Sequence, residues 1–555
     1  MIQSGLLVLL IVVVVSAVAS WRNRRQLLLR IGSQWGRPRD RQRDIEAISD
    51  FFRSHGETMA ALDDRTWRDL LLDEVFAHLD RTESTIGQQV LYKRLRSAPV
   101  WLDEFEALIA RMSTDGNRRE RAQVALARLN DNAGYYVHRL TFPETLQRRW
   151  WHIIFPIWSG AVVVTLSLSV FWPKLIFMAV LFFIVNFLIR ISTARRVSAE
   201  IAWFRQVGPL LSAARQLAAM ESSDAPTLTS ALKSDLRALK RLGGIARWVS
   251  RDPFTTNDIA FAVMEYLNVL LLMDANALYF AARELQLRGT NLRGVIEAVG
   301  EIDAAIAVAS FRAGSRQWAR PNFVGPTGPA KFAKLCHPLL KNAVPNSLSL
   351  APPHGLLVTG SNMSGKSTLL RTLGVNVVLA QTINTCFAES YMAPVYQVRS
   401  CIGRADDLIA GKSYYLVEVE SVLTLVRASE SSAPHLFIFD ELFRGTNAVE
   451  RIAAAEAVLG TLIGSGKPHV TVAATHDGEL VDLLRDSYSV CHFGDALGPD
   501  GLIFDYRLIP GPATSRNAIA LLELNGAPES MVRYALSRAR ELDQERRKVE
   551  SKTRT

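Results

Sequence analysis

Two stretches of the chain are almost entirely apolar and predict helices that cross a membrane. Residues 1–21 carry no charged side chain, and at a rise of about 1.5 Å per residue they are just long enough to span the hydrocarbon. The second stretch runs from Trp150 to Ile189 and is interrupted by FWPK at 171–174, where Pro173 and Lys174 predict a turn. The pattern therefore predicts an anchor and a helical hairpin with arms near 153–171 and 175–190, three transmembrane helices in all.

Arginines next to these apolar stretches predict their orientation. A dense arginine cluster at 22–43 follows the first stretch, Arg148 precedes the hairpin, and Arg190, Arg195 and Arg196 follow it. Cytoplasmic segments beside membrane helices are rich in Lys and Arg, so we expect the N-terminus outside and both ends of the hairpin inside. This predicts a multi-pass protein of the cell membrane, in contact with the lipid of the inner or plasma membrane, with its other domains in the cytoplasm.

Each membrane prediction has an alternative. The AVA tripeptide at 17–19 resembles a signal-peptide cleavage site, but no positive segment precedes the apolar run and arginines follow it. The hairpin is alternatively a buried pair of helices in a soluble domain, although FMAVLFFIVNFLI at 177–189 has no polar face to present to water. We therefore favour spans in both places.

The segments on either side of the hairpin show apolar residues at helical spacing. LLLDEVFAHLD and FEALIARM lie within 45–140, and similar patterns fill 195–315. AFAVMEYLNVLLLMDANAL at 260–278 predicts a long core helix, because Glu265 and Asp274 argue against a further span. Both segments are therefore expected to be helical and to lie outside the membrane.

The pattern changes near residue 355, where a short buried strand, a glycine-rich turn and a helix follow one another. The turn matches GxxxxGK[ST] from Gly360 to Ser367. Backbone N–H groups of such a turn bind phosphates, a lysine reaches the β- and γ-phosphates, and a Ser hydroxyl binds Mg²⁺. The predicted ATP-binding residues are Gly360, Asn362, Gly365, Lys366, Ser367 and Thr368, with Ser367 also a metal ligand.

Two later strands end in residues that suit phosphoryl chemistry. HLFIFDE at 435–441 predicts a strand that ends in Asp440 and Glu441, where one acid organises Mg²⁺ and the next activates water. HVTVAATHD at 469–477 predicts a strand that ends near His476, at the edge of the sheet where ligands bind. We therefore expect Asp440 to be a metal ligand, Glu441 the general base, and His476 a sensor of the γ-phosphate.

Together these motifs resemble the ATPase of the MutS family, within the wider ABC ATPase group. TGSNMSGKSTLLR, DELFRGT and ATHDGEL carry the resemblance, which is strong over 330–540 and weaker over 60–140 and 195–320. It implies a homodimer in which Ser413, within GRADDLIAGKSYYLVEVES, completes the partner's ATP site. It also implies a helical core, a lever region and, over 511–535, a helix-turn-helix segment that supports dimerisation.

The chain departs from mismatch-repair members of that family at its N-terminus. Those members carry a mismatch-reading domain with a Phe-x-Glu wedge, whereas the first sixty residues here are an apolar run and a basic linker. FAE at 387–389 matches the wedge pattern but falls inside the ATPase sheet, where we expect a structural role. The resemblance therefore implies ATP use and not mismatch reading by this chain.

Charge and cysteine content add little to this interpretation. The net charge of +10 fits a partner with phosphates, but the arginines at 22–43 supply much of it, so it is weak support for DNA binding. Cys336, Cys386, Cys401 and Cys491 form no CxxC pair and predict neither a disulfide framework nor a zinc site.

The expected fold class is an α/β P-loop ATPase of ABC type joined to an all-α lever and core domain with three transmembrane helices. The expected organisation is an anchor at 1–21, a basic linker at 22–59, a helical core at 60–149, a transmembrane hairpin at 150–190, a lever region at 191–320, the ATPase domain at 321–510 and a dimerisation segment at 511–555.

The expected function is Mg²⁺-dependent ATP hydrolysis at composite dimer sites that moves the levers on DNA, in a process related to repair or recombination. One alternative is a scaffold or signalling ATPase that binds no DNA. Another is an ABC-type transport ATPase, which the lack of an LSGGQ-like stretch and of intramembrane ionisable residues disfavours.

Overall fold

The chain forms two compact units in the computed structural model. It describes residues 18, 21–55, 62–97, 102–146, 150–220, 225–249, 266–352, 354–361, 364–402, 414–444, 446–498, 501–513, 519, 522–523 and 525–553. The first unit comprises Met1–Met59 and Phe76–Arg316, and the second comprises Ala60–Val75 and Gln317–Thr555. Each unit is thus built from two separate segments of the sequence.

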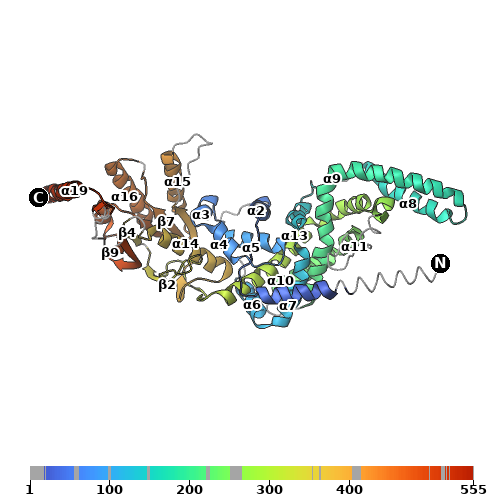
Figure 1. Ribbon diagram of the computed structural model, residues 1–555, viewed down its shortest axis with the longest axis horizontal. Helices are drawn as coiled ribbons and strands as arrows, with labels where there is room; N and C mark the ends of the chain where they lie inside the picture. Colours follow the sequence, from blue (N-terminus) through green and yellow to red (C-terminus); the bar gives the residue numbers. More distant parts are fainter. Residues whose placement is uncertain are drawn as a thin grey trace. The chain divides into compact units, whose positions relative to one another are not determined.

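The first unit is helical throughout its described residues (Figure 1). Its helices are α2 (Ile45–Ser54), α5 (Thr85–Arg96), α6 (Leu102–Thr114), α7 (Gly116–Leu126), α8 (Ile154–Leu168), α9 (Ile176–Ala219), α10 (Pro226–Ala238), α11 (Lys240–Val249) and α13 (Met273–Gly314), and α4 (Leu72–Leu79) joins the two units. Short 3₁₀ helices lie at Ala127–Leu129, Asn132–Thr141, Trp150–Ile153 and Pro173–Leu175.

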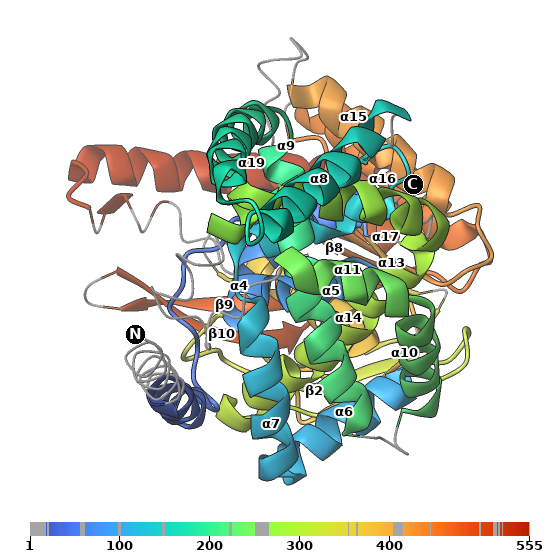
Figure 2. The same cartoon turned by 90° about the vertical axis from the view of Figure 1, so that its right-hand side faces the viewer.

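Helix α13 forms the centre of this unit and packs beside α10 and α11 (Figure 2). Its inner face is rich in small residues, which allows neighbouring backbones to approach closely. A Cβ at Gly300 would lie 2.2 Å from Cγ2 of Val90 on α5, so only glycine permits this contact. Close packing of this kind fixes where the long helix lies relative to α5.

Three arginines of the basic segment point into the helical unit. Arg41 and Arg43 contact the fully buried carboxylate of Asp80 at 2.6 and 2.9 Å, and Arg39 binds buried Glu83. Burial alone would raise the pKa of Asp80, but the two arginines outweigh it and the pKa is lowered. These positive charges therefore balance buried carboxylates, a role that the sequence pattern did not indicate.

The predicted hairpin exists as two helices, but the prediction that it crosses a membrane is wrong. None of the helices in the described part of the chain combines the length and the apolar character that a bilayer crossing needs. Helix α8 has 15 residues, whereas a span needs about 20. The apolar part of α9 ends before Arg190, and its Asn186 donates to the Leu270 carbonyl and accepts from the Trp158 indole.

This finding also overturns the predictions that depended on the spans. The fold class with three transmembrane helices, the multi-pass location in the cell membrane and the lipid partner are all corrected with it. The anchor predicted at 1–21 lies almost wholly outside the described residues. Hydrogen bonds from Ser159 of α8 and Asn186 of α9 tie the two helices to the segment before α13, while many of their large apolar side chains are exposed.

The second unit contains two sheets covered by helices. A six-stranded sheet has the order β10-β9-β4-β8-β7-β6, with every neighbouring pair parallel except β9 and β10. Its strands are β4 (Gly355–Thr359), β6 (Gln397–Cys401), β7 (His435–Asp440), β8 (Val470–Ala474), β9 (Tyr488–Gly498) and β10 (Gly501–Pro510). The smaller sheet, β1-β5-β2-β3, contains β1 (Asn322–Phe323), β2 (Ala330–Leu335), β3 (Asn346–Leu350) and β5 (Ser390–Ala393).

Helices cover both faces of the larger sheet. Phe437 and Phe439 of β7 pack in one hydrophobic cluster with residues of α15 (Tyr414–Ala428), α16 (Ala448–Gly464) and α17 (Gly478–Leu484). Ile438 points to the opposite face, toward α14 (Lys366–Ile383). Alternate side chains of a strand point to opposite faces, so these buried strands are apolar on both sides. Helix α19 (Glu529–Thr553) follows the sheet in the sequence.

A short N-terminal segment is built into this second unit. Helix α3 (Asp64–Asp69) lies beside β6, and buried Asp69 accepts hydrogen bonds from Ser400 Oγ at 2.8 Å and from the Ile402 N–H at 2.9 Å. Arg371 of α14 donates to the Asp69 carbonyl at 2.9 Å. The helical core predicted at 60–149 therefore begins with residues that belong to the unit of the sheet.

Candidate nucleotide site

The strand, turn and helix predicted around residue 360 are confirmed as β4, a tight loop and α14. Gly360 and Gly365 have φ angles of +134° and +108°, which side-chain-bearing residues rarely adopt. Lys366 is buried, and its Nζ donates to the carbonyls of Gly360 at 2.8 Å and Ser361 at 3.0 Å. The loop therefore curves around the ammonium group, and burial lowers the pKa of that lysine.

Ser367 and Asp440 come together at the carboxyl edge of the sheet. Ser367 begins α14, Asp440 ends β7, and Ser367 Oγ donates to Asp440 Oδ2 at 2.5 Å. Burial raises the pKa of Asp440, while the bond from Ser367 opposes the change. The two predicted metal ligands are thus in direct contact, and their roles as ligands stay predictions.

Glu441 lies at the centre of the charged groups of the site. Its carboxylate lies 3.5 Å from His476 Nδ1, 2.8 Å from Arg444 Nη1 and 4.0 Å from Lys366 Nζ. The hydrogen bond with His476 is the main reason why the pKa of Glu441 is lowered, and the same bond raises the pKa of His476. Glu441 is therefore held ionised beside the loop, as a general base requires.

Two buried hydroxyls of the loop have no hydrogen-bond partner within the described part of the chain. These are Ser361 Oγ and Ser364 Oγ, on either side of the tip of the loop. Buried polar atoms are almost always paired in folded proteins, so this pair marks space for a polar ligand. The predicted residues Asn362 and Ser413 lie outside the described residues.

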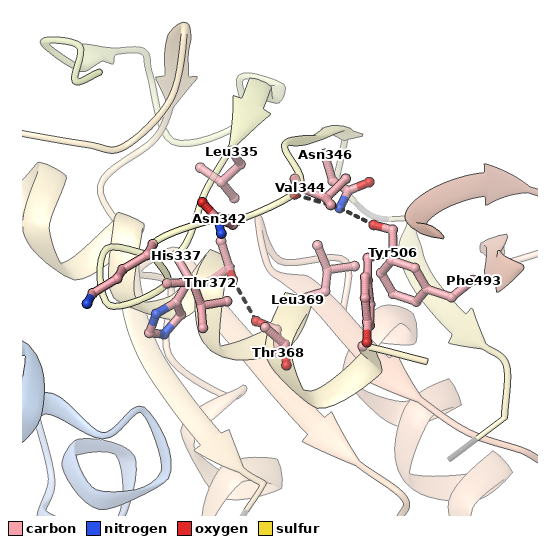
Figure 3. Close-up of a pocket in the computed structure, with 14 residues that line it drawn as sticks. Leu335, His337, Asn342, Val344, Asn346, Thr368, Leu369, Thr372, Phe493 and Tyr506 are labelled. Carbon is pink, nitrogen blue, oxygen red and sulfur yellow. Dashed lines mark hydrogen bonds between the residues drawn. The ribbon is translucent and has the colours of Figure 1, made fainter. Parts of the chain in front are cut away.

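A pocket of about 400 Å³ opens beside the loop (Figure 3). Gly365, Thr368 and Leu369 form its floor, and Tyr506 and Phe493 lie on its other side. Thr368, predicted to bind ATP, faces this pocket. A Cβ at Gly365 would lie 3.3 Å from Cδ1 of Tyr506, so the tyrosine ring approaches the glycine-rich turn directly.

An irregularity in β10 brings Tyr506 to the pocket. The register of β9 and β10 shifts between Phe504 and Leu508, and Tyr506 has a φ of +54°. Asn346 of β3 fixes this bulge, because its amide donates to the Tyr506 carbonyl at 3.0 Å and accepts from the Leu508 N–H at 2.8 Å. Bulges commonly redirect a side chain next to a functional site.

The sequence alone did not single out several residues that contact the site. Arg444 lies within the DELFRGT motif but had no predicted role. Arg451 of α16 forms a bidentate salt bridge with Asp477, next to His476: its Nε and Nη2 donate to the carboxylate at 3.0 and 2.7 Å. The motif offered a signal for Arg444, whereas the bulge that carries Tyr506 left none in the local pattern.

Comparison with protein families identifies this part of the chain. Residues 356–543 match the family model described as MutS domain V. Over these residues the chain is similar to the MutS family. The predicted resemblance is therefore confirmed, and the matched residues include the loop, both carboxylates and His476.

Relatives named DNA mismatch repair protein MutS match part of the chain. The chain is 33% identical over 278 residues to the DNA mismatch repair protein MutS of Thermus caldophilus, covering 48% of this chain and 32% of that protein. It is 34% identical over 252 residues to the protein of that name from Thermus aquaticus, covering 44% and 30%. It is 36% identical over 197 residues to the protein of that name from Streptococcus pyogenes serotype M1, covering 35% of this chain and 23% of that protein. The matches thus span about a third or less of these relatives.

Proposed function

We propose that this protein hydrolyses ATP with Mg²⁺ at the site formed by the loop and by the ends of β7 and β8. The observation that carries the proposal is the contact between Ser367 and Asp440 beside the Glu441–His476 pair. Few functions other than phosphoryl transfer need a hydroxyl, two carboxylates, a histidine and a buried lysine around a phosphate-binding loop. The match of residues 356–543 to MutS domain V supports the same conclusion.

The residues fit ATP and a divalent ion. The unpartnered hydroxyls of Ser361 and Ser364 can donate to phosphate oxygens, and Lys366 Nζ can donate to the phosphates in place of the loop carbonyls. Ser367 and Asp440 would hold Mg²⁺, which neutralises charge on the phosphates when it is bound. Mg²⁺ commonly uses one or two protein ligands together with phosphates, so a larger acidic cluster is not required.

The remaining residues act on the attacking water. Glu441 would accept its proton, because the contact with His476 keeps this carboxylate ionised. His476 lies at the end of β8 and is 45% exposed, so it can contact both Glu441 and a terminal phosphate. Arg444 holds the second oxygen of Glu441 and limits its orientation.

The pocket beside the loop suits the nucleoside part of ATP. It adjoins Gly365 and Thr368 at the start of α14, where the phosphates would lie. Its volume of about 400 Å³ falls within the range of small-molecule sites, and Tyr506 offers an aromatic face for a base. We therefore assign Tyr506 as the residue that stacks on adenine.

Two variants test this function in the full-length protein. Glu441→Gln should bind ATP with near wild-type affinity and lose turnover by about 10²- to 10⁴-fold, because it lacks the base. Lys366→Ala should lose ATP binding as well, since the buried ammonium is gone. Exposed Lys331 offers a matched control, and Lys331→Ala should change neither property. Wild-type protein that binds no ATP, or a Glu441→Gln variant with full turnover, would contradict the proposal.

We further propose that the protein acts as a homodimer in which Ser413 completes the partner's site. The support is the match to MutS domain V and the position of Ser413 in the sequence just before α15. A hydroxyl in that position can alternatively cap a helix, at a cost of about 1 kcal/mol when it is lost. Mixing Ser413→Ala with Lys366→Ala should restore turnover, because one composite site in each heterodimer is then intact. Heterodimers with no more activity than either variant alone would favour the helix cap.

We also propose that ATP hydrolysis serves a process on DNA, moving the long helices of the first unit. The support is that the MutS relatives are named DNA mismatch repair proteins. Binding of duplex DNA by the full chain, with an affinity that falls steeply as salt rises, is the expected result. Binding that is undetectable even at low salt, in protein that hydrolyses ATP, would favour a scaffold or signalling ATPase.

A further inference from the structure

The turn that carries Glu441 has an unusual backbone. Glu441 and Phe443, the first and third residues after β7, have φ angles of +50° and +57°. Residues with side chains pay about 1–2 kcal/mol for this left-handed conformation, so the surrounding structure must hold it. The orientation of Glu441 toward His476 depends on that conformation.

Two hydrogen bonds hold the backbone of this turn. The Glu441 N–H donates to the Ala474 carbonyl of β8 at 3.0 Å. The Phe443 N–H donates to Oε1 of Glu418 at 2.6 Å, and Glu418 is 4% exposed on α15. A hydrogen bond from a backbone N–H to a carboxylate is stronger than one to a neutral acceptor. One anchor therefore comes from the sheet and the other from a helix distant in sequence.

The carboxylate of Glu418 lies on the face of α15 that packs against the turn. Val422 and Leu425, one and two turns further along α15, pack in the hydrophobic cluster that also contains Leu442 and Phe443. An apolar side chain at position 418 would extend that cluster, whereas a buried carboxylate is costly unless it is hydrogen-bonded. The same face of α15 thus packs against the turn and fixes its backbone.

We propose that Glu418 is a positioning residue for Glu441. Its carboxylate holds the Phe443 N–H, and this keeps the left-handed turn in the conformation that directs Glu441 toward the attacking water. The inference rests on the proposed ATPase function of the same site. A shift of about 1 Å in a reacting group can cost up to 100-fold in rate, so a loss at this anchor should appear in turnover.

Two conservative variants separate the effect of the side-chain length of Glu418 from the effect of its charge. Glu418→Gln keeps the length and an acceptor oxygen but loses the charge, and Glu418→Asp keeps the charge but is one methylene too short. We expect Glu418→Gln to keep kcat within about threefold of wild type and Glu418→Asp to lose about tenfold or more. Both should bind a non-hydrolysable ATP analogue within about threefold of wild type, because neither alters the phosphate loop.

Glu420 on the exposed side of α15 supplies the control. Glu420→Asp and Glu420→Gln should leave kcat and binding unchanged. Wild-type turnover in Glu418→Asp, or equal losses of kcat and of nucleotide affinity, would overturn the inference while leaving the ATPase proposal in place. Absence of turnover in the wild-type protein would instead remove the ATPase proposal itself.

Hydrogen exchange at the Phe443 amide decides the matter if Glu418→Asp does not fold. The amide should exchange faster in Glu418→Gln than in wild type, because a neutral acceptor binds the N–H less strongly than a carboxylate does. Equal exchange in wild type and in the folded Glu418→Gln protein, with other amides of the sheet unchanged, would count against the carboxylate as the group that holds this N–H.

Discussion

Nδ1 of His476 lies 3.5 Å from Oε1 of Glu441, so the residues that follow β8 and β7 meet at one edge of the sheet. The contact changes both side chains, since it lowers the pKa of the carboxylate and raises that of the imidazole. Neither residue is close to the other in sequence, and the parallel pairing of the two strands brings them together.

We expect His476→Ala to lower kcat at least tenfold and to change the affinity for ATP by less than about threefold, as loss of a group that orients the base would. His354 is a matched control, because it is exposed and precedes β4 at the opposite edge of the sheet. Steady-state ATPase rates and analogue binding measure both quantities. A His476→Ala variant with wild-type kcat would exclude this role.

Tyr506 should contribute to affinity and not to chemistry. Tyr506→Ala is expected to raise KM about tenfold with kcat retained, because stacking of a base on an aromatic ring is worth about 1–3 kcal/mol. Tyr506→Phe keeps the ring and should stay within about twofold of wild type. Tyr266, exposed in the first unit, gives the control Tyr266→Ala. A larger loss in Tyr506→Phe than in Tyr506→Ala would contradict stacking.

The carboxylate of Asp69 should stabilise the unit of the sheet. Asp69→Ala leaves the Ser400 hydroxyl and the Ile402 N–H without their acceptor, at about 1–3 kcal/mol for each buried donor. The change in the free energy of unfolding is measured by urea denaturation, with the loss of nucleotide binding as the signal for unfolding. Asp64→Ala, at an exposed position on the same helix, should have little effect. Equal stability of the two variants would contradict this anchor.

Buried His435 should make stability fall at acid pH. Burial lowers its pKa from 6.5 to about 4, so between these values the unfolded chain binds a proton that the folded chain does not. The folded state therefore loses about 2 kcal/mol from this group as pH falls from 7.5 to 5, and nothing further below its folded pKa. Urea denaturation of wild type and His435→Gln at both pH values tests this. The variant should lose less than wild type, and an identical pH dependence would contradict the prediction.

Local patterns predicted the elements that carry the phosphate site. GLLVTG and the residues after it gave β4, the loop and α14, and the apolar runs before Asp440 and His476 gave β7 and β8. These elements are predictable because each motif and its strand or helix are adjacent in sequence. The roles assigned to their side chains stay predictions until the variants are measured.

Long-range contacts explain what the sequence did not reveal. Nothing near Asp69 indicates Ser400, and nothing near Arg41 indicates that Asp80 would draw it into the helical unit. The bulge at Tyr506 depends on Asn346 from another sheet. The prediction of membrane spans at 150–190 is wrong because the hydropathy of the whole stretch does not show that α8 has only 15 residues and that the apolar part of α9 ends before Arg190.

The placement of α3 has a consequence for the order in which the protein folds on the ribosome. Asp69 is synthesised 331 residues before Ser400. At a rate of 5–20 residues per second, roughly 15 to 65 s pass before the Ser400 hydroxyl that binds its carboxylate has been synthesised. The first unit, whose last residue is Arg316, can be complete by then, while the segment Ala60–Val75 is still without the sheet on which it packs. The segment therefore stays unpacked in the nascent chain until the residues of the sheet have been synthesised. A chain released before that point would expose the side chains of Trp67 and Leu70, which are buried in the folded protein, to the cell's chaperones and proteases.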